Sequence, residues 1–265
     1  MSEPTKQVRW RFALRMALIH LGINVVVALL VAALIFGVWY PQPYPELMGG
    51  LKLLGLIVAV DMVCGPVLTS VLANPKKPKR EMATDLSLVA VIQLAALIYG
   101  LHAVAQARPV FVAFEADRFT VVSAAEIDHD KLAEALPEFR SLPWWGVKRI
   151  GLRDAKDGNE KLSSLQMSLQ GVEPSARPDW WTEETAAYRE RIRKKMKPLA
   201  DLEKMYPNNA DLAAAVKRSA LPPQDLYYLP FTSQKNKSWT VLMDKNTDFK
   251  AFVHLDAFGA QEQDK

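Results

Sequence analysis

The stretch Leu53–Arg80, LLGLIVAVDMVCGPVLTSVLANPKKPKR, decides the fold class of this chain. Its first part, Leu53 to Ala73, is a run of about twenty mostly apolar residues, the length that crosses roughly 30 Å of hydrocarbon as a helix. One carboxylate, Asp61, and the pair Gly65-Pro66 interrupt this run, and a basic segment follows it. An apolar run that ends in a basic segment is typical of a membrane protein with a fixed orientation.

Two further apolar runs flank this stretch. Met16–Trp39 follows a basic N-terminal segment, and residues 86–105 contain Gln93 and Tyr99. The first run is longer than the apolar part of a signal peptide, and no Ala-x-Ala cleavage pattern follows it, so we expect an uncleaved helix. The sequence therefore predicts a membrane domain over residues 1–105, with transmembrane helices at about 16–39, 53–73 and 86–105.

The basic residues near these runs predict an orientation. The connector after the second run contains Asn74, Pro75, Lys76, Lys77, Lys79 and Arg80. Short basic loops are retained in the cytoplasm, so we expect the N-terminus and this connector to be cytoplasmic. Asp85 or Ser87 is expected to cap the third helix, which leads outward. Residues 106–265 then lie across the membrane, in the periplasm if the source is a Gram-negative bacterium.

The loop between the first two runs is expected at the outer face of the membrane. Its prolines at 41, 43 and 45 prevent helix continuation. Trp39, Tyr40 and Tyr44 are expected at the outer membrane–water interface, where amphipathic aromatic rings are favoured.

Charge and cysteine content exclude some function classes. The formal net charge of +4 comes from the membrane segments, because basic and acidic residues beyond residue 105 are equal in number. A neutral outer domain argues against nucleic-acid binding, which needs a basic patch on the folded domain. The single cysteine, Cys64, permits no intramolecular disulfide and is expected to be a small buried apolar residue.

Residues 106–265 are predicted to form an outer domain of mixed α+β class. Alternating β-branched and aromatic residues predict strands at 110–114, 119–122, 144–152, 227–231, 239–243 and 251–255. Helices are predicted at 130–136, 179–196 and 210–219, and the acidic first turn and basic last turn of 179–196 match the helix dipole. Residues 115–118 are expected to be the turn of a hairpin between the first two strands, and residues 244–248 suit a second hairpin loop.

Asp61 is the main candidate for a functional residue in the membrane. A charge facing lipid at that depth costs about 2.5 to 3.5 kcal/mol, so Asp61 should face another helix. Counting residues along the helices puts Asp61 roughly 12 Å and Gln93 roughly 18 Å below the outer surface, which makes Gln93 the expected hydrogen-bond partner. Recognition of a second membrane protein and stabilisation of the bundle itself remain equal alternatives. Gly65 and Pro66 predict a close helix approach or a kink.

No catalytic or metal-binding pattern is found in the sequence. The acidic segment around residues 154–160 lacks the full calcium-loop spacing, and His129 and His254 have no partner at metal-ligand spacing. Nucleophile and phosphate-binding motifs are missing as well. We therefore expect no enzyme, no metal site and no cofactor.

Several short motifs together resemble a known family. They are DMVCGPVLT at 61–69, NPKK at 74–77, DLS at 85–87, QLAALIYG at 93–100, ARPV at 107–110 and DRF at 117–119. These motifs look like those of the TfpX/TfpZ family of type IV pilin accessory proteins. In the outer domain the motifs include Arg108, Pro109, Asp117 and Arg118. Beyond residue 122 the resemblance to the family is thinner, and it includes the segment from Trp239 to Leu242.

The resemblance implies a non-enzymatic inner-membrane protein of fimbrium biogenesis that serves the major type IV pilin. We expect the second and third helices to receive the pilin's membrane helix and the outer domain to contact its head. The expected partner-binding residues are Asp61, Gly65, Pro66, Gln93 and Tyr99. Other pilus assembly proteins and the lipid bilayer are further expected partners, whereas nucleic acid is not. A membrane enzyme that modifies pilin, and a sensor acting through a partner, are the alternatives.

Overall fold

The computed structural model describes the backbone of residues 3–259 and the side chains of residues 7–50, 54–56 and 58–259. The chain forms two compact units. One, the membrane unit, comprises the chain up to Tyr40 together with Gly49–Gln106. The other, the outer unit, comprises Pro41–Met48 and the chain from Ala107 onward. The short segment 41–48 thus belongs with the outer unit, although the sequence analysis assigned it to the membrane domain.

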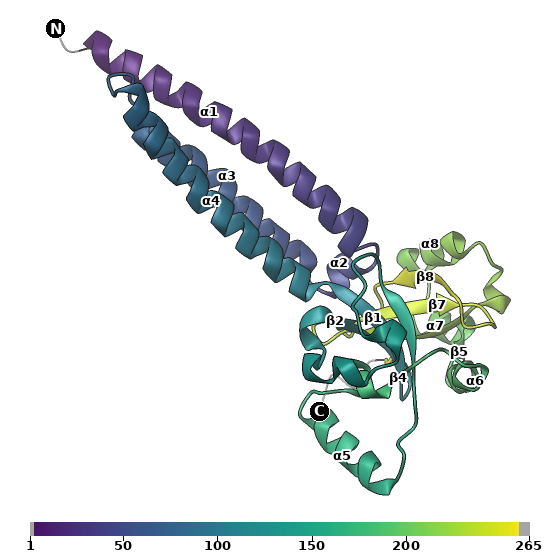
Figure 1. The fold of residues 1–265 in the computed structure, drawn as a ribbon. Helices are drawn as coiled ribbons and strands as arrows, with labels where there is room; N and C mark the ends of the chain where they lie inside the picture. The colour runs from purple at the N-terminus through teal and green to yellow at the C-terminus, as the bar shows by residue number, and fades with distance from the viewer. Residues whose placement is uncertain (1–2, 260–265) are drawn as a thin grey trace. The chain divides into compact units, whose positions relative to one another are not determined.

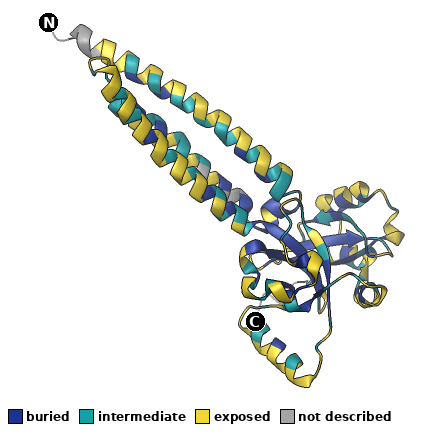
Figure 2. Cartoon of the chain, viewed as in Figure 1, coloured by how far each residue is buried: buried dark blue, intermediate teal, exposed yellow. Residues whose placement is uncertain are grey.

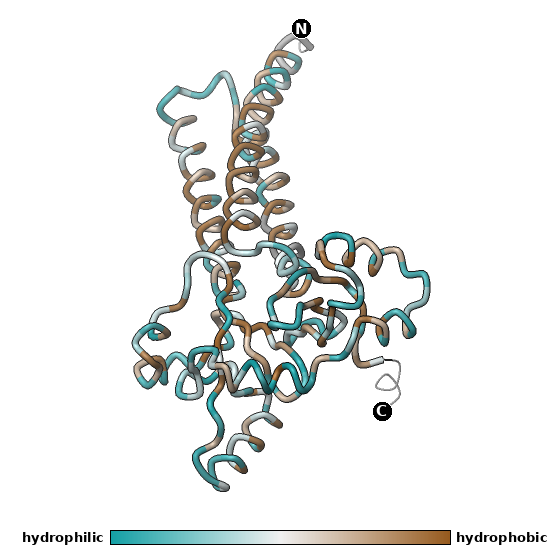
Figure 3. Tube along the Cα trace, turned by 90° about the vertical axis from the view of Figure 1, so that its right-hand side faces the viewer, coloured by the Kyte–Doolittle hydropathy of each residue, from teal (hydrophilic) through white to brown (hydrophobic). Residues whose placement is uncertain are grey.

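The membrane unit consists of three long helices (Figure 1). They are α1 (Glu3–Leu34), which continues into a π-helical turn at Ile35–Trp39, α3 (Gly50–Leu72) and α4 (Lys79–Ala107). All three are long and apolar enough to cross a membrane. Their exposed surfaces are largely apolar, as Figures 2 and 3 show together. Such an exterior suits lipid and is costly in water.

The third helix begins earlier than predicted, at Lys79, and the expected N-cap at Asp85 or Ser87 is wrong. Asp85 lies inside α4, where it accepts a hydrogen bond of 2.6 Å from Lys77 Nζ. The same ammonium lies 3.4 Å from Glu81. These charged contacts stabilise an additional polar turn and leave a shorter connector than expected.

The outer unit is built on a mixed sheet of eight strands (Figure 1). The strands are β1 (Pro109–Glu115), β2 (Arg118–Ser123), β3 (Lys148–Leu152), β4 (Trp181–Thr182), β5 (Lys197–Pro198), β6 (Tyr227–Thr232), β7 (Trp239–Met243) and β8 (Phe249–Val253). Their order is β4-β3-β1-β2-β6-β7-β8, and β5 pairs with β6. The β1–β2 and β7–β8 hairpins are antiparallel, whereas β1–β3 and β2–β6 are parallel. The predicted α+β class is confirmed.

Several predicted elements need correction. The predicted strand 144–152 covers only β3, because residues 144–147 form an irregular turn in which Gly146 has φ 65°. The last strand starts at Phe249 and ends at Val253. Leu255, predicted to belong to it, instead accepts a bond from the Thr240 hydroxyl (2.7 Å).

The predicted helix 179–196 is wrong over its first part. Residues 178–180 form a 3₁₀ turn, and Trp181 and Thr182 pair with β3. The helix α6 (Ala186–Arg193) starts after Thr185, whose hydroxyl accepts the N–H of Tyr188 (3.1 Å). The other helices of the unit are α2 (Tyr44–Leu47), α5 (Gly158–Leu169), α7 (Leu199–Met205) and α8 (Ala210–Ser219), the last as predicted.

The two faces of the sheet carry different cores. Tyr228, Leu242 and Ala251 form a cross-strand row that packs with apolar residues of α7 and α8. Because side chains alternate along a strand, the neighbouring residues point to the opposite face. There Phe231 and Phe252 lie 4.9 Å apart between ring centroids.

Segment 41–48 covers part of this second face. The rings of Tyr44 and Phe231 lie 6.1 Å apart, and Ser233 Oγ donates a hydrogen bond of 2.8 Å to the carbonyl of Leu47. Leu47 and Met48 are buried. The loop between the first two long helices is therefore part of the core of the outer unit.

Gly151 in β3 offers a test of the β3–β4 packing. A Cβ at this position would lie 2.3 Å from the carbonyl oxygen of Glu183, a backbone atom that cannot move alone. We expect Gly151→Ala to destabilise the outer unit by about 1–3 kcal/mol, the usual cost of overpacking. Thermal unfolding of the full chain in detergent, followed by near-ultraviolet circular dichroism, measures the change.

Gly158→Ala is the matched control, because a Cβ at Gly158 meets no atom within 4 Å. It should leave the melting temperature unchanged or raise it slightly, since alanine favours a helix more than glycine. Equal melting temperatures for the two variants would contradict the close approach at Gly151.

Candidate functional site

A polar seam runs through the apolar interior of the membrane unit. We use this name for Asn24 of α1, Asp61 and Gly65 of α3, and Gln93 of α4. Asn24 Nδ2 donates a hydrogen bond of 2.6 Å to the backbone carbonyl of Asp61. The seam therefore brings together side chains from all three long helices.

Pro66 lies in the turn of α3 at which the seam forms. Proline has no N–H and its ring crowds the carbonyl four residues earlier, here Met62, so the helix is weakened locally. A polar backbone group without a partner costs several kcal/mol in hydrocarbon. The amide of Asn24 supplies a donor to the neighbouring carbonyl and so stabilises the same turn. Sequence reasoning missed Asn24, although a lone asparagine within the first apolar run was a visible signal.

Gly65 permits the close approach of the three helices. A Cβ on Gly65 would lie 2.2 Å from Gln93 Nε2 and 3.0 Å from Asn24 Nδ2. The predicted close approach at Gly65 is thus present. Gln93 Nε2 is buried there and has no hydrogen-bond partner among the described residues.

The side chain of Asp61 lines a small cavity between the helices. The cavity has a volume of about 20 Å³ and is otherwise lined by Asn24, Val27, Ala28, Val31, Val58, Met62 and Leu97. The expected hydrogen bond between Asp61 and Gln93 is not formed, because Gln93 lies over Gly65, one helical turn away. Within the described part of the chain, no cation pairs with the Asp61 carboxylate.

A second polar contact joins α1 and α3. His20 Nδ1 and Thr69 Oγ1 are hydrogen-bonded at 2.6 Å, and Thr69 is buried. Together with the Asn24 bond, this contact fixes the register of α1 along α3. It gives His20 a structural partner and separates it from Asp61.

Two candidate residues of the membrane unit lie on its surface. Tyr99 of α4 is 77% exposed. Cys64 is also exposed, so the expectation that it is buried was wrong. Both positions are consistent with contact to lipid or to a partner helix.

The basic connector is ordered by its own contacts. Asn74 Oδ1 accepts the N–H of Lys76 (3.1 Å), and the Asn74 carbonyl accepts that of Lys77 (3.1 Å). Pro75 lies in this turn, whereas Lys79 and Arg80 belong to the first turn of α4.

The motif residues of the outer unit do not form one site. Arg108 stacks on Trp144 at 4.7 Å, and Pro109 begins β1. Asp117 and Arg118 pair at the β1–β2 turn (3.0 Å), and Arg118 also lies over Phe258. Trp239 stacks on His254 at 5.0 Å. These contacts are structural, so the motif marks the fold of the unit.

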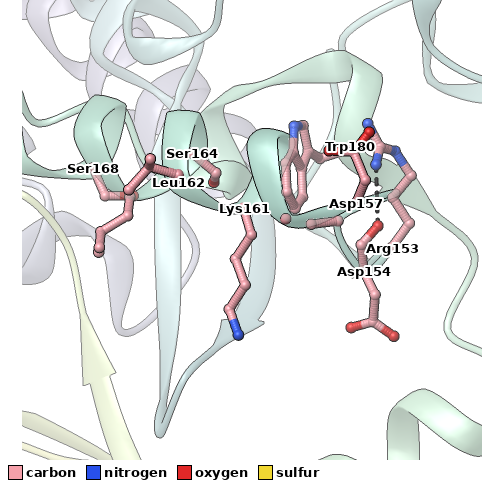
Figure 4. A pocket seen from close by; sticks show the side chains of 11 residues that line it. Arg153, Asp154, Asp157, Lys161, Leu162, Ser164, Ser168 and Trp180 are labelled. Atoms are coloured by element: carbon pink, nitrogen blue, oxygen red, sulfur yellow. Dashed lines mark hydrogen bonds between the residues drawn. The ribbon is translucent and has the colours of Figure 1, made fainter.

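A cavity with a volume of about 890 Å³ lies beside α5 in the outer unit (Figure 4). Arg153 and Trp180 form one wall, with the guanidinium 4.6 Å from the ring centroid, and Lys161 points away from them. Arg153 holds Glu160 by two hydrogen bonds of 2.8 and 2.7 Å. These bonds and one from the Lys156 backbone lower the pKa of Glu160 to about 2. The Arg153 guanidinium and the Glu160 carboxylate therefore form a bidentate ion pair.

No metal-binding group is found among residues 3–259, where no three His, Cys, Asp or Glu side chains gather suitably. Asp157 caps α5 by accepting the N–H of Glu160 (2.8 Å), which explains the acidic residues of this segment structurally.

The fold and the seam define a class of protein: three helices that could span a membrane, joined by a polar seam, and a C-terminal α+β unit. A family model described as fimbrial assembly protein FimB matches residues 8–49. The fimbrial assembly proteins of serogroups I and E1 of Dichelobacter nodosus are each 39% identical over 252 residues, covering 94% of this chain and 98% of theirs. That of serogroups C1 and C2 is 46% identical over 127 residues, covering 48% of this chain and 97% of its own.

The chain therefore belongs to the fimbrial assembly protein family. No solved structure gives a significant match to it.

Gly65→Ala tests the close approach within the seam. The added methyl group would displace Gln93, so we expect a loss of stability of about 1–3 kcal/mol. Gln93 meets the methyl group with the end of a flexible side chain. The double variant Gly65→Ala/Gln93→Ala should therefore recover most of the loss. Melting temperatures of the four proteins of this cycle, measured in lipid nanodiscs, give the coupling.

Gly55→Ala serves as control in the same helix, since a Cβ there meets nothing within 4 Å. Strictly additive losses in the double variant would disprove the contact between Gly65 and Gln93.

The Arg153–Glu160 pair predicts a pH dependence of stability. Above pH 4.5, the ordinary pKa of glutamate, the carboxylate is charged in both the folded and the unfolded chain, and the contact stabilises the fold. Between pH 4.5 and about 2 the unfolded chain binds a proton that the folded chain does not, so this stabilisation fades. Glu160→Gln should therefore lower the melting temperature at pH 7 and progressively less as the pH falls through this range.

Glu203→Gln, at an exposed position of α7, is the control and should differ little from the parent protein at any pH. A difference between Glu160→Gln and the parent that stays constant from pH 7 to pH 2 would refute the assignment.

Proposed function

We propose that this protein is an inner-membrane accessory protein of type IV pilus biogenesis, of the TfpX/TfpZ kind, and that it binds the major pilin. Its relatives are named fimbrial assembly proteins, which supports a role in fimbrial assembly. The resemblance of its motifs to the pilin accessory family narrows that role to pilin. By binding pilin, the protein assists the stability of pilin, its assembly or the dynamics of the pilus.

One observation carries the membrane part of this proposal. Asp61 is an ionisable residue inside an apolar helix, and in the described chain its carboxylate is paired with no cation. Such residues are expensive in a membrane and usually serve a function. A donor on an incoming helix gives the carboxylate the hydrogen bond that it lacks within the bundle.

The second polar group of the seam supports the same partner. Gln93 Nε2 is buried without an acceptor in the described chain and lies next to Gly65 on the adjacent helix. Small residues let helix backbones approach closely, and unpaired amides favour contact with a further helix. Exposed apolar side chains of α3 and α4, among them Val63, Val67 and Leu94, border this region. A single apolar pilin helix matches such a surface.

The proposed topology follows from the distribution of charge. Lys76, Lys77, Lys79 and Arg80 hold the α3–α4 connector in the cytoplasm. The outer unit then lies in the periplasm, where it contacts the pilin head. The proposal contains no catalytic step, cofactor or metal. Other pilus assembly proteins join the complex through pilin.

Asp61→Leu should weaken pilin binding without changing the orientation of the chain. A hydrogen bond between membrane helices contributes about 1–2 kcal/mol, which corresponds to roughly five- to thirtyfold in affinity. Asp61→Asn keeps a hydrogen-bonding group and should lose less. Binding is measured by quantitative co-purification of the major pilin. A reporter that is active only in the periplasm, fused to the C-terminus, follows the orientation of the chain.

Photo-crosslinkers at Asp61 and Gln93 locate the contact directly. Both should capture pilin, whereas a crosslinker at the control position Leu30, on the exposed surface of α1, should not. Capture of unrelated proteins alone, or an inverted reporter, would overturn the proposal. The intact mass of pilin made with and without this protein separates binding from modification: an added mass would favour a membrane enzyme.

A further inference from the structure

Trp144 and Trp145 form an exposed aromatic pair on the outer unit. They are 61% and 76% exposed, whereas Trp180, Trp181 and Trp239 of the same unit are buried. Pro143 precedes the pair, and Gly146, with φ 65°, follows it in a tight turn. Two adjacent large exposed rings are an unusual feature of a protein surface and call for an explanation.

This pair lies against the residue that follows the last long helix. α4 ends at Ala107, and Arg108 is the next residue. The Arg108 guanidinium carbon lies 4.7 Å from the centroid of the Trp144 ring, and Arg108 Nη2 lies 3.5 Å from the carbonyl oxygen of Pro143. Trp144 is therefore in direct contact with the residue that follows α4 in the chain.

The end of α4 has a defined depth if the helix crosses a bilayer. Its apolar part ends at Val104, and three more residues carry the helix only about 4.5 Å further. The interfacial layer on each side of the hydrocarbon is about 5–7 Å thick. Arg108 consequently falls within the layer of lipid headgroups.

Tyr40 and Tyr44, two of the three aromatic residues that the sequence assigned to this layer, are buried in the protein. The Tyr40 hydroxyl donates a hydrogen bond of 3.0 Å to the Val104 carbonyl, and the Tyr40 ring is buried. Tyr44 is packed on Phe231. Both tyrosine rings thus pack against protein.

We infer that Trp144 and Trp145 form a membrane-interface anchor, and that their partner is the headgroup boundary of the bilayer that α4 enters. Tryptophan suits this boundary, because its ring is apolar and its N–H finds a hydrogen bond in the headgroup layer. Arg108 is buried against Trp144, so the surface offered to the headgroup layer consists of the two exposed indole rings. The anchor holds the outer unit by a contact independent of the helices, and it does not depend on pilin binding.

Site-directed spin labelling of the full chain in proteoliposomes tests the anchor. In a Cys64→Ser background, single cysteines replace Trp145, Val91 on the exposed surface of α4, and Glu203 on the exposed surface of α7. The ratio of accessibility to oxygen over a water-soluble nickel chelate reports depth in the bilayer. The label at 145 should give a value several-fold above that at 203 and below that at 91.

A second measurement keeps both tryptophans of the proposed anchor and follows their fluorescence. With Trp10 and Trp39 replaced by phenylalanine, lipids brominated near the headgroup should quench part of the tryptophan fluorescence. Trp144→Ser/Trp145→Ser should abolish this quenching, because the remaining tryptophans are buried.

The remaining outcomes overturn the inference in distinguishable ways. If the label at residue 91 is as accessible to the nickel chelate as a label in water, α4 does not enter the bilayer and the premise of the inference is wrong. A water-like label at 145, with 91 in lipid, refutes the anchor itself. A label at 145 that becomes shielded only when purified pilin is added, or only at protein densities that produce dimers, assigns the surface to pilin or to a second copy.

Discussion

A proline within an apolar helix is the constraint on which the membrane unit depends. Pro66 removes one backbone donor from α3 in a medium that offers no water in exchange. A side-chain amide of α1 contacts this turn, because Asn24 Nδ2 donates a hydrogen bond to the backbone carbonyl of Asp61. Gly65, one residue before the proline, lets Gln93 of α4 reach the same place. The three helices thus meet at the turn of α3 that contains the proline, and Gln93 Nε2 is buried there without a hydrogen-bond partner among the described residues.

The outer unit depends on a different requirement, namely that both faces of its sheet be covered. α7 and α8 cover one face, and the loop between the first two long helices covers part of the other. Segment 41–48 is short, yet its Leu47 is buried and its backbone accepts a hydrogen bond from Ser233. The outer unit therefore includes chain from before and after the second and third long helices.

Several charged groups of the outer unit are used in structure. Arg153 and Glu160 pair with each other, Asp157 caps a helix, and the motif residues Arg108 and Arg118 stack on aromatic rings. What remains open to a partner is mainly apolar surface, with a few polar groups buried in the membrane unit. Membership of the fimbrial assembly protein family agrees with the proposed binding role, and pilin is the partner that the motifs favour.

The sequence by itself determined the three apolar helices, the α+β class of the outer unit, the β1–β2 and β7–β8 hairpins and helix α8. Each depends on local periodicity, length or turn residues, which are visible without a structure. Tertiary structure decided the rest. Depth counting paired Asp61 with Gln93, although the same count puts Gly65, one turn further along α3, level with Gln93 at roughly 18 Å. The structure indeed places Gln93 over Gly65 and Asn24 beside Asp61. The acidic first turn and basic last turn of 179–196 predicted one helix. Trp181 instead pairs with Leu152 in the sheet, so the helix begins later. Long-range contacts alone buried Tyr40 and Tyr44 and left Trp144 and Trp145 exposed, because burial depends on which distant surfaces meet.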